Sequence, residues 1–346
     1  MADAQLCGSV NLESADAVFA AIADISGSTV HRVPDGETGE RQQWIMAQMP
    51  RFAANPDFTR PNGETGFAYG ARPDFRLREG LSPDEASFDL GYAVGATESY
   101  PLFRRLRDEG RFTPDTRFQV SLPTQMAIVG VFIDPSQQAL IAPVFERALA
   151  TEIDTILETV PAGDLALQWD VAVEFSRLEG GIDGVPASAE EEQAILDQLV
   201  RLGDLVPDLV ELGYHLCYGD APEAPGETGK HLKQPEDTSR LVRVANAIVD
   251  GVRRRVDWIH MPVPIERDDD AYFAPLQHLH LPPETRLFLG LVHWQDGVEG
   301  TQRRIDAAAR HAIGFGVATE CGMGRRPREV VPTLLQIQRE VTVPAR

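Results

Sequence analysis

The chain has 346 residues, of which 43% are hydrophobic and 25% are charged, a composition typical of a globular protein. Its formal net charge of -21 at pH 7 argues against binding to nucleic acid or to an anionic membrane surface, because both need a basic patch. No run of about 18 apolar residues and no secretory signal is found, so we expect no membrane partner. The three cysteines (Cys7, Cys217 and Cys321) are too few for a disulfide framework, which favours a cytoplasmic location.

Apolar runs typical of buried strands alternate with amphipathic segments, which predicts β-α-β units and a parallel sheet. The predicted strands are 6–12, 29–33, 118–123, 165–175, 211–218, 257–263, 286–294 and 314–321. The predicted helices are 14–25, 136–160, 187–205, 236–253, 298–311 and 328–340. Eight strands favour an α/β fold of the (β/α)8 TIM barrel type. A doubly wound open sheet is the alternative, although no Gly-x-Gly-x-x-Gly fingerprint opens a strand-to-helix turn.

Residues 34–116 are rich in Pro, Gly, Arg and Phe and show weak periodicity. A stretch of this length between strands is usually functional or has small elements of its own. We interpret it as an elaborated N-terminal insertion that covers one barrel end, within a single barrel domain spanning 1–346. At its start, Asp35, Glu37 and Arg41 stand among glycines and are predicted to face the substrate; a tight acidic turn is the structural alternative.

A His-x-Cys pair, His215 and Cys217, lies in the predicted strand 211–218. Residues two apart in a strand point to the same face, so an imidazole and a thiolate are aimed at one point. Zinc favours this mixture of ligands. Cys321 ends the predicted strand 314–321 and would join the same metal if a closed barrel brought it close. The alternative is that these cysteines are small buried hydrophobes.

Polar residues stand near the C-terminal ends of five predicted strands, where TIM-barrel enzymes carry out their chemistry. They are Asp170, His215 with Cys217, His260, His293, and Glu320 with Cys321. A single strand histidine is more often a hydrogen-bonded core residue. Their shared location nevertheless predicts one site, with the long loop 218–235 on the same face.

Five short motifs are distributed along the predicted barrel. They are Gly8-Ser9, Ser121-Leu122-Pro123-Thr124, Gln168-Trp169-Asp170, His215-Leu216-Cys217-Tyr218 and Glu320-Cys321-Gly322. Together they resemble the catalytic barrel of cobalamin-independent methionine synthase and its shorter relatives in the uroporphyrinogen decarboxylase-like superfamily. The resemblance extends over roughly 5–20 and 117–340, and the two segments that resemble the family's zinc motifs are its most specific parts.

The resemblance implies a zinc-dependent transferase that moves a methyl or other alkyl group from a small-molecule donor to a small-molecule thiol. Zn²⁺ bound by His215, Cys217 and Cys321 would lower the pKa of the thiol and deliver a thiolate. Either His293 or Asp296 is expected to protonate the leaving group. The substrate-binding residues implied in the same way, or predicted beside them, are Gly8, Ser9, Thr124, Gln168 and Asp170.

The chain departs from the family at several positions. Val171-Ala172 replaces the family's Glu-Pro, and Gln295 falls near the position of its acid histidine. The strand that should provide a zinc glutamate has none, so we expect His260 to supply the fourth ligand, with Glu266 as a weaker candidate.

Two other functions remain open at this point. A metal-free decarboxylase or lyase resembling uroporphyrinogen decarboxylase would act on carboxylates through Asp and Arg, and His215 and Cys217 would only line the cavity. A non-catalytic small-molecule-binding barrel would use zinc structurally, with His260 closing the site. No counterpart of the family's duplicated N-terminal half, which contributes to folate binding, is present. The sequence therefore does not name the donor or the thiol, and it leaves a homodimer open.

Overall fold

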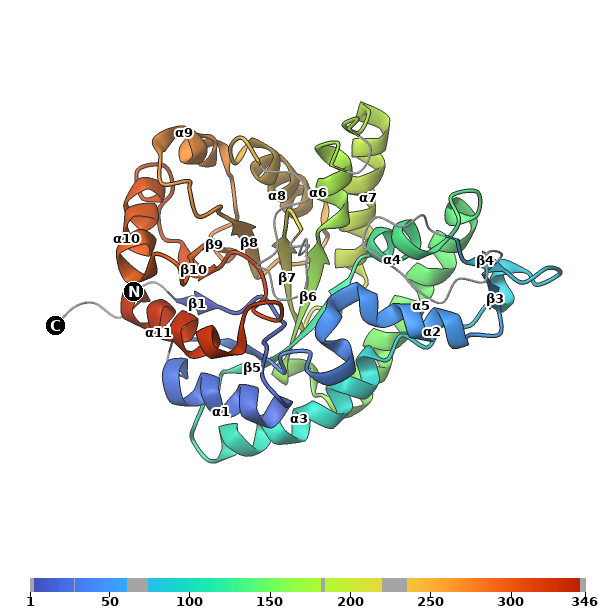
Figure 1. Ribbon diagram of the computed structural model, residues 1–346, viewed down its shortest axis with the longest axis horizontal. Coiled ribbons are helices and arrows are strands. Elements are labelled where there is room, and N and C mark those ends of the chain that lie inside the picture. Colours follow the sequence, from blue (N-terminus) through green and yellow to red (C-terminus); the bar gives the residue numbers. More distant parts are fainter. Residues whose placement is uncertain (1–2, 28, 61–73, 182–183, 220–234, 343–346) are drawn as a thin grey trace.

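The computed structural model describes residues 3–27, 29–60, 74–181, 184–219 and 235–342. Eight parallel strands form one sheet in the order β1-β10-β9-β8-β7-β6-β5-β2. A parallel bridge between Ala4 of β1 and Val30, two residues before β2, brings the two edges of the sheet together in a nearly closed barrel, with helices around its outside (Figure 1). The predicted TIM barrel is confirmed.

The eight barrel strands correspond to the eight predicted ones. They are β1 (Ala4–Gln5), β2 (Arg32–Pro34), β5 (Arg117–Pro123), β6 (Leu165–Val171), β7 (Glu211–Leu216), β8 (Trp258–Pro262), β9 (Arg286–Val292) and β10 (Gly316–Thr319). The first predicted strand, 6–12, is wrong in extent, because Gly8 adopts a φ of 120° and only Val10 pairs again, with Met323. The predicted strand 165–175 is too long, because a helix begins at Val173.

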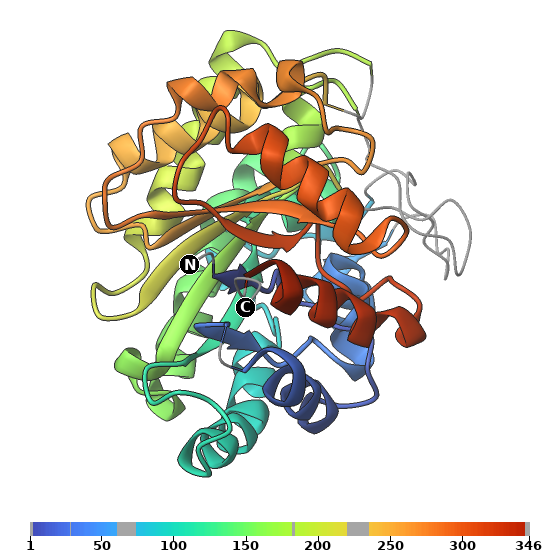
Figure 2. The same cartoon turned by 90° about the vertical axis from the view of Figure 1, so that its left-hand side faces the viewer.

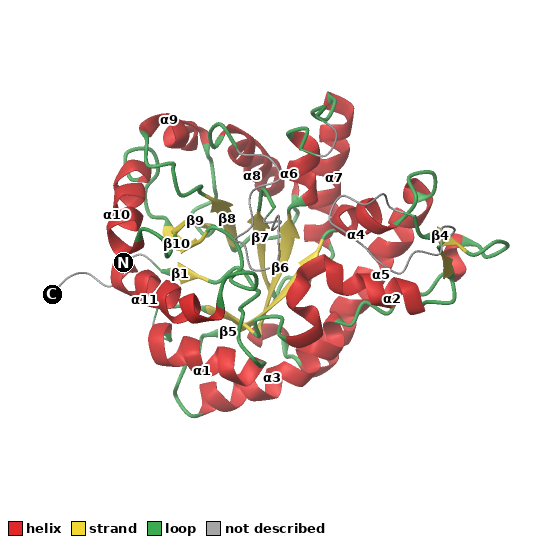
Figure 3. Ribbon diagram, viewed as in Figure 1, coloured by secondary structure: helices red, strands yellow, loops and turns green. Residues whose placement is uncertain are grey.

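The outer layer is made of helices that follow the strands (Figure 3). They are α1 (Ala15–Ser26), α3 (Tyr92–Asp108), α4 (Gln125–Phe132), α5 (Gln138–Thr159), α6 (Val173–Leu178), α7 (Ala189–Asp204), α8 (Ser239–Gly251), α9 (Asp270–Phe273), α10 (Gly297–Ala308) and α11 (Val331–Thr342). Side chains cap several N-termini: Ser14 accepts from Ala17 N, and Ser188 with Glu191 forms a capping box. No helix in the described part of the chain is long and apolar enough to cross a membrane.

Residues 34–116 connect β2 to β5. They contain η1 (Gly39–Ala47), α2 (Gln48–Ala54), the hairpin β3 (Phe58–Thr59) and β4 (Arg76–Leu77), η2 (Pro83–Glu85) and α3, which belongs to the outer layer. Figure 1 shows α2 and the hairpin beside the barrel, next to α4 and α5. An aromatic cluster attaches them there: the Phe52 ring stacks on that of Phe132, and the Phe88 ring meets that of Phe145 edge-on.

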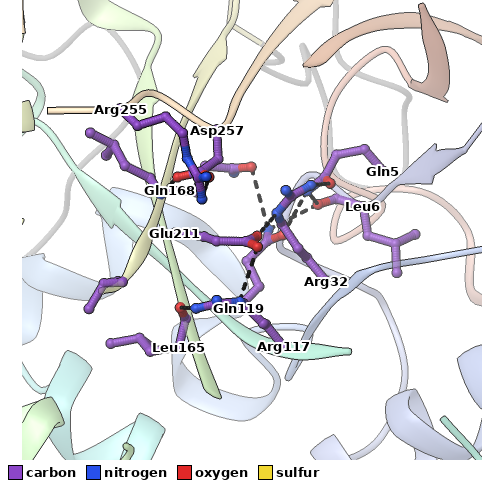
Figure 4. A network of polar contacts seen from close by, with 12 residues as sticks. Gln5, Leu6, Arg32, Arg117, Gln119, Leu165, Gln168, Glu211, Arg255 and Asp257 are labelled. Carbon is purple, nitrogen blue, oxygen red and sulfur yellow. Dashed lines mark hydrogen bonds and ion pairs between the residues drawn. The ribbon is translucent and has the colours of Figure 1, made fainter. Parts of the chain in front are cut away.

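The barrel interior is filled by polar side chains that run in a hydrogen-bonded column towards the C-terminal strand ends (Figure 4; Figure 2 shows the barrel from the side). At the N-terminal ends of the strands, the Glu211 carboxylate pairs with Arg32 at 2.6 Å and with Arg117 at 3.0 Å. From Arg32 the contacts pass through Gln5, Gln119 and Gln168 to Asp170. Because buried polar groups are costly unless paired, this column fixes side-chain orientation beneath the site.

The Gly213→Ala variant should be less stable by about 1–3 kcal/mol, because overpacking a dense interior forces neighbours to move. Gly213 on β7 pairs with Trp258 on β8, and a methyl group at Gly213 would lie 1.9 Å from the fully buried indole. Urea unfolding of the variant measures the change. The matched control is Gly163→Ala, whose new Cβ would meet nothing within 4 Å. Equal stability of the two variants would contradict this packing.

Candidate metal centre and active site

Two strands bring an imidazole and two thiols together at the C-terminal end of the barrel. His215 is on β7, Cys217 follows that strand directly, and Cys321 lies two residues after β10. The Sγ atoms of Cys217 and Cys321 are 3.6 Å apart, and Cys321 Sγ is also 3.6 Å from His215 Nε2. One ligand atom from each residue lies within 4.8 Å of the others, so the three residues form a group that could hold a metal.

These spacings fit a zinc ion. Zn–S bonds of about 2.3 Å and Zn–N bonds of about 2.0–2.1 Å at tetrahedral angles put neighbouring ligand atoms about 3.6–3.8 Å apart. The distances from Cys321 to Cys217 and to His215 match that range. If these three residues bound zinc, a fourth position would be left for water or substrate, as in catalytic zinc sites.

The environment favours a thiolate at Cys321. The hydrogen bond with Cys217 and the imidazole of His215 hold the pKa of Cys321 well below its usual value, against the effect of burial. Burial disfavours the imidazolium form of His215, but the neighbouring Cys7 and Cys321 sulfurs raise its pKa well above the usual value. The backbone N–H of Gly219 also donates to Cys217 Sγ at 3.3 Å. The group therefore stabilises negative charge on sulfur, the ligand form that zinc requires.

His260, the predicted fourth ligand, lies on the other side of the His215 ring. Its Nδ1 is 2.7 Å from His215 Nδ1, and its Nε2 is 3.0 Å from the carbonyl oxygen of Thr319. With Cys7 and His215 it forms a second group of residues that could hold a metal. Both ring nitrogens of His260 are thus engaged, and the ring would have to break these contacts to join Cys217 and Cys321. Glu266, the weaker candidate, is not in either group.

A small cavity of about 40 Å³ lies beside the sulfur atoms. Asp170 and Glu37 line it together with His215, Cys217 and Cys321. Burial, and then the nearby charge of Asp170, raises the pKa of Glu37 to about 8. Burial also raises the pKa of Asp170 to about 6, even though His215 opposes the shift. Two carboxyl groups that share a buried space in this way suit a ligand with a positive charge.

Asp170 is held firmly by its neighbours. Gln168 Nε2 donates to Asp170 Oδ1 at 2.9 Å, and Trp44 Nε1 donates to Oδ2 at 3.1 Å. Gln168, predicted to bind substrate, is fully buried and also donates to the carbonyl of Cys7 at 2.9 Å. Gln168 does not line the cavity itself, and its role there is to orient the carboxylate of Asp170.

The loop after β2 places Glu37 by means of Asp35. The Asp35 carboxylate accepts from the backbone N–H of Glu37, from Ser99 Oγ and from the Arg41 guanidinium. Glu37 has a φ of 51°, a left-handed conformation that non-glycine residues seldom adopt. Asp35 and Arg41 are thus structural partners of the loop, and Glu37 is its residue beside the sulfurs. Such strain tends to occur at functional sites.

Replacing Glu37 by Gln should change how stability depends on pH. The folded-state pKa of about 8 exceeds the ordinary value of 4.5, so the native protein holds the proton more tightly than the unfolded chain. The protonated Glu37 side chain therefore makes its full contribution to the free energy of unfolding below pH 4.5. That contribution is lost as the pH rises towards 8. The free energy of unfolding of Glu37→Gln, relative to the parent, should rise across that interval. A difference that stays constant with pH would contradict the assignment.

The Gly8-Ser9 turn lies at the same edge. Ser9 lines the small cavity, and its carbonyl accepts from Met323 N at 2.7 Å, which ties the turn to the loop that bears Cys321. Gly8 has no room for a side chain, because a Cβ would lie 2.8 Å from Ser121 Oγ. The close approach of these segments explains the glycine.

A larger cavity of about 760 Å³ adjoins the small one, and Glu37 and Trp44 line both. Its walls come from η1, α2, the segment around Phe88, and the end of β5 at Ser121 and Pro123. The insertion therefore builds a second chamber over the C-terminal barrel end. A volume of this size suits an organic ligand.

Three predicted site residues take other positions. Thr124 is fully buried and caps α4 by accepting from Ala127 N at 3.1 Å. His293 Nε2 is 2.9 Å from the carbonyl oxygen of Val263, and burial lowers its pKa. Asp296 is paired with Arg304 at 2.7 Å, and this contact overcomes burial and lowers the pKa of the carboxyl. None of the three is among the residues that line the two cavities.

Sequence reasoning did not place Cys7 or Trp44 in the site, although both line the small cavity. Cys7 could have been found, because it directly precedes the Gly8-Ser9 turn. The sequence has no corresponding signal for Trp44, which reaches Asp170 from η1 with a φ of 52°. Most of the predicted loop 218–235 lies outside the described residues.

No protein-family model and no curated protein sequence matches this chain. Among solved structures it is similar to a B12-independent methionine synthase from Shewanella sp. W3-18-1 in complex with selenomethionine, with 13% identity and a TM-score of 0.59. That alignment covers 98% of this chain and 97% of the other. The fold is that of a methionine synthase barrel. The predicted resemblance is thereby confirmed at the level of the fold.

Two further structures agree with this likeness. A putative vitamin-B12 independent methionine synthase from Listeria monocytogenes has 10% identity and a TM-score of 0.54, over 97% of this chain and 96% of the other. A methyltransferase from Methanosarcina mazei has 10% identity and a TM-score of 0.51, over 98% of this chain and 94% of the other. Identities this low establish the shared fold alone, and function depends on the residues of the site.

Proposed function

We propose that this chain is a zinc-dependent enzyme that transfers a methyl or other alkyl group to the sulfur of a thiol. The observation that carries the proposal is the convergence of His215, Cys217 and Cys321, in which Cys321 Sγ lies 3.6 Å from both Cys217 Sγ and His215 Nε2. These atoms lie beside one small cavity that opens next to a much larger one. Zinc held by this group would lower the pKa of an incoming thiol, so that it binds as a thiolate at neutral pH.

The two cavities suit two substrates. The thiol acceptor fits the small cavity beside the sulfurs, where Asp170 and Glu37 would bind a cationic group such as an amine. The alkyl donor fits the larger cavity. In the reaction, the acceptor sulfur forms a bond to the alkyl carbon while the bond from that carbon to the donor breaks, and the electron pair leaves with the donor. The protein's part is to align the two substrates and to exclude water.

The predicted acids His293 and Asp296 have no part in this proposal. Asp296 is held as a carboxylate by Arg304, and the lowered pKa of His293 leaves its ring neutral at pH 7. Glu37, with a pKa of about 8, is the carboxyl beside both cavities that retains a proton at neutral pH. A bound ammonium group would displace this proton from Glu37.

The alternative decarboxylase is less well supported. A polycarboxylate substrate needs several cations that it can reach, but both arginines that line the larger cavity are already ion-paired, and the one arginine that lines the small cavity, Arg325, shares it with Asp170 and Glu37. Arg41 contacts Asp35 at 2.6 Å, and Arg51 contacts Asp89 at 2.9 Å. A closed structural zinc site with His260 as the fourth ligand is also disfavoured, since both nitrogens of that ring already have partners.

The Asp170→Asn variant tests the substrate assignment. Loss of a charged hydrogen bond to the acceptor's amino group should cost about 1.5–3 kcal/mol, or roughly a 10- to 100-fold weaker Kd for an amino thiol such as homocysteine. The measurement is thiol binding to the zinc-loaded protein by calorimetry. The matched ligand is a thiol of similar length without an amino group, whose affinity should change little. Equal losses for both ligands would contradict the role of Asp170.

A further inference from the structure

Three residues at one level of the barrel form a row of inward-facing polar side chains. Asp170 on β6 pairs in register with His215 on β7, which in turn pairs with His260 on β8. The two imidazole centroids are 4.6 Å apart, and the His260 side chain is fully buried. The row connects to β10 through the Thr319 carbonyl, which accepts from His260 Nε2 at 3.0 Å.

The contacts determine which nitrogens carry protons. A carbonyl oxygen can only accept, so His260 Nε2 must be protonated where it meets Thr319. The neutral His260 ring then has a bare Nδ1, which accepts from His215 Nδ1 across 2.7 Å. His215 therefore carries its proton on Nδ1. When the His215 ring gives up its other proton to bind a metal, the lone pair is left on Nε2, the atom that faces Cys321.

The position of the Thr319 carbonyl has a visible cause. The register between β10 and β9 shifts between Val317 and Thr319, a β-bulge-like irregularity. Bulges redirect backbone and side chains next to active sites. Here the carbonyl accepts from the side chains of His260 and Cys7.

We propose that His260 is a positioning residue that, anchored by the Thr319 carbonyl, holds His215 as the Nδ1–H tautomer and so presents Nε2 to the metal shared with Cys217 and Cys321. This inference rests on the proposed metal site for its purpose, but the contacts from His215 Nδ1 to His260 and from His260 Nε2 to Thr319 are present in the metal-free protein. Metal-binding histidines commonly donate their second ring N–H to an outer partner, and losing that partner typically costs 10–100-fold in metal affinity. A second histidine in this position takes the role that a carboxylate or carbonyl usually fills.

Two variants of His260 separate positioning from ligation. In His260→Asn the amide oxygen can replace Nδ1 as the acceptor for His215, whereas His260→Leu removes the acceptor. Zinc Kd, measured against a competing chelator, should weaken roughly 10- to 100-fold in the Leu variant and only about threefold in the Asn variant. Equal, severe loss in both variants would show that His260 binds the metal directly and would overturn the proposal. Unchanged affinity in the Leu variant would overturn it as well.

The tautomers can be observed without metal. Long-range ¹H–¹⁵N spectra of the metal-free protein, labelled at its eight histidines, should show His260 with a bare Nδ1 and a protonated Nε2. The His260→Asn variant assigns the signal. A protonated Nδ1 on His260 would overturn the proposal whether or not zinc binds. Failure of the parent protein to bind zinc, with the expected tautomer present, would instead refute the proposed function and leave the hydrogen-bonded chain standing.

Discussion

Cys321→Ser is expected to abolish stoichiometric zinc binding. Zinc prefers thiolate to a neutral hydroxyl, and Cys321 Sγ is the atom that contacts both other ligand atoms, Cys217 Sγ and His215 Nε2. The loss in affinity should exceed the roughly 10- to 100-fold that removal of an outer partner costs, and alkyl transfer should fall with it. Zinc per chain, measured by atomic emission after dialysis, is the direct readout, and Cys217→Ser should behave in the same way.

Cys7→Ser is the matched control for this experiment. Cys7 belongs to the other group that could hold a metal, with His215 and His260, and it lies at the end of a different strand. If the proposed centre is right, Cys7→Ser retains its zinc and Cys321→Ser does not. If Cys7→Ser lost its zinc and Cys321→Ser retained it, the metal would be bound by Cys7, His215 and His260 instead. That result would refute the catalytic site built around Cys321.

Asp296→Ala is expected to destabilise the fold by about 3 kcal/mol, because breaking a buried ion pair leaves an uncompensated charge. The Arg304 side chain is fully buried, and it donates to both oxygens of Asp296 at 2.7 and 2.8 Å. Its remaining bonds, to the carbonyls of Leu291 and Ile265, cannot neutralise the guanidinium. Asp296 is partly exposed, which places the effect at the lower end of the range for buried pairs. Urea unfolding measures the change.

Asp268→Ala provides the comparison for this variant. Asp268 makes an ion pair of 3.0 Å with Arg303, but both side chains are exposed, so its loss should cost at most about 1 kcal/mol. If Asp296→Ala were instead as stable as the parent and deficient only in turnover, an acid role for Asp296 would be supported. The two measurements therefore separate a structural role from a catalytic one.

Much of the barrel could be read from the sequence because buried parallel strands are nearly continuous apolar runs. All eight barrel strands lie at or next to their predicted positions. The four-residue helix α9 was not predicted, and α3 lies in the segment 34–116 that was interpreted as an insertion. The short helices α4 and α6 were also not predicted. Their apolar residues, such as Ile128 and Phe175, continue the pattern of the strands before them, so periodicity alone did not mark the boundary.

The candidate ligands were predictable from their spacing and motifs, since a strand aims His215 and Cys217 to one side and Cys321 ends another strand. The substrate contacts were less predictable. Gln168 lies on β6 and Thr124 directly follows β5, yet the first orients Asp170 and the second caps a helix. Trp44 reaches the cavity from the insertion, where the sequence has no periodic pattern.

The sequence by itself determined the class of fold and the chemical character of the site, because strand periodicity and ligand type are local properties of the chain. Only the tertiary structure decided which atoms meet: that Glu37 lies close to Asp170, and that His260 faces His215 rather than the sulfurs. The physical reason is that these contacts depend on the register between strands and on the shift at Thr319. A change of one residue in register turns every side chain of a strand to the opposite face.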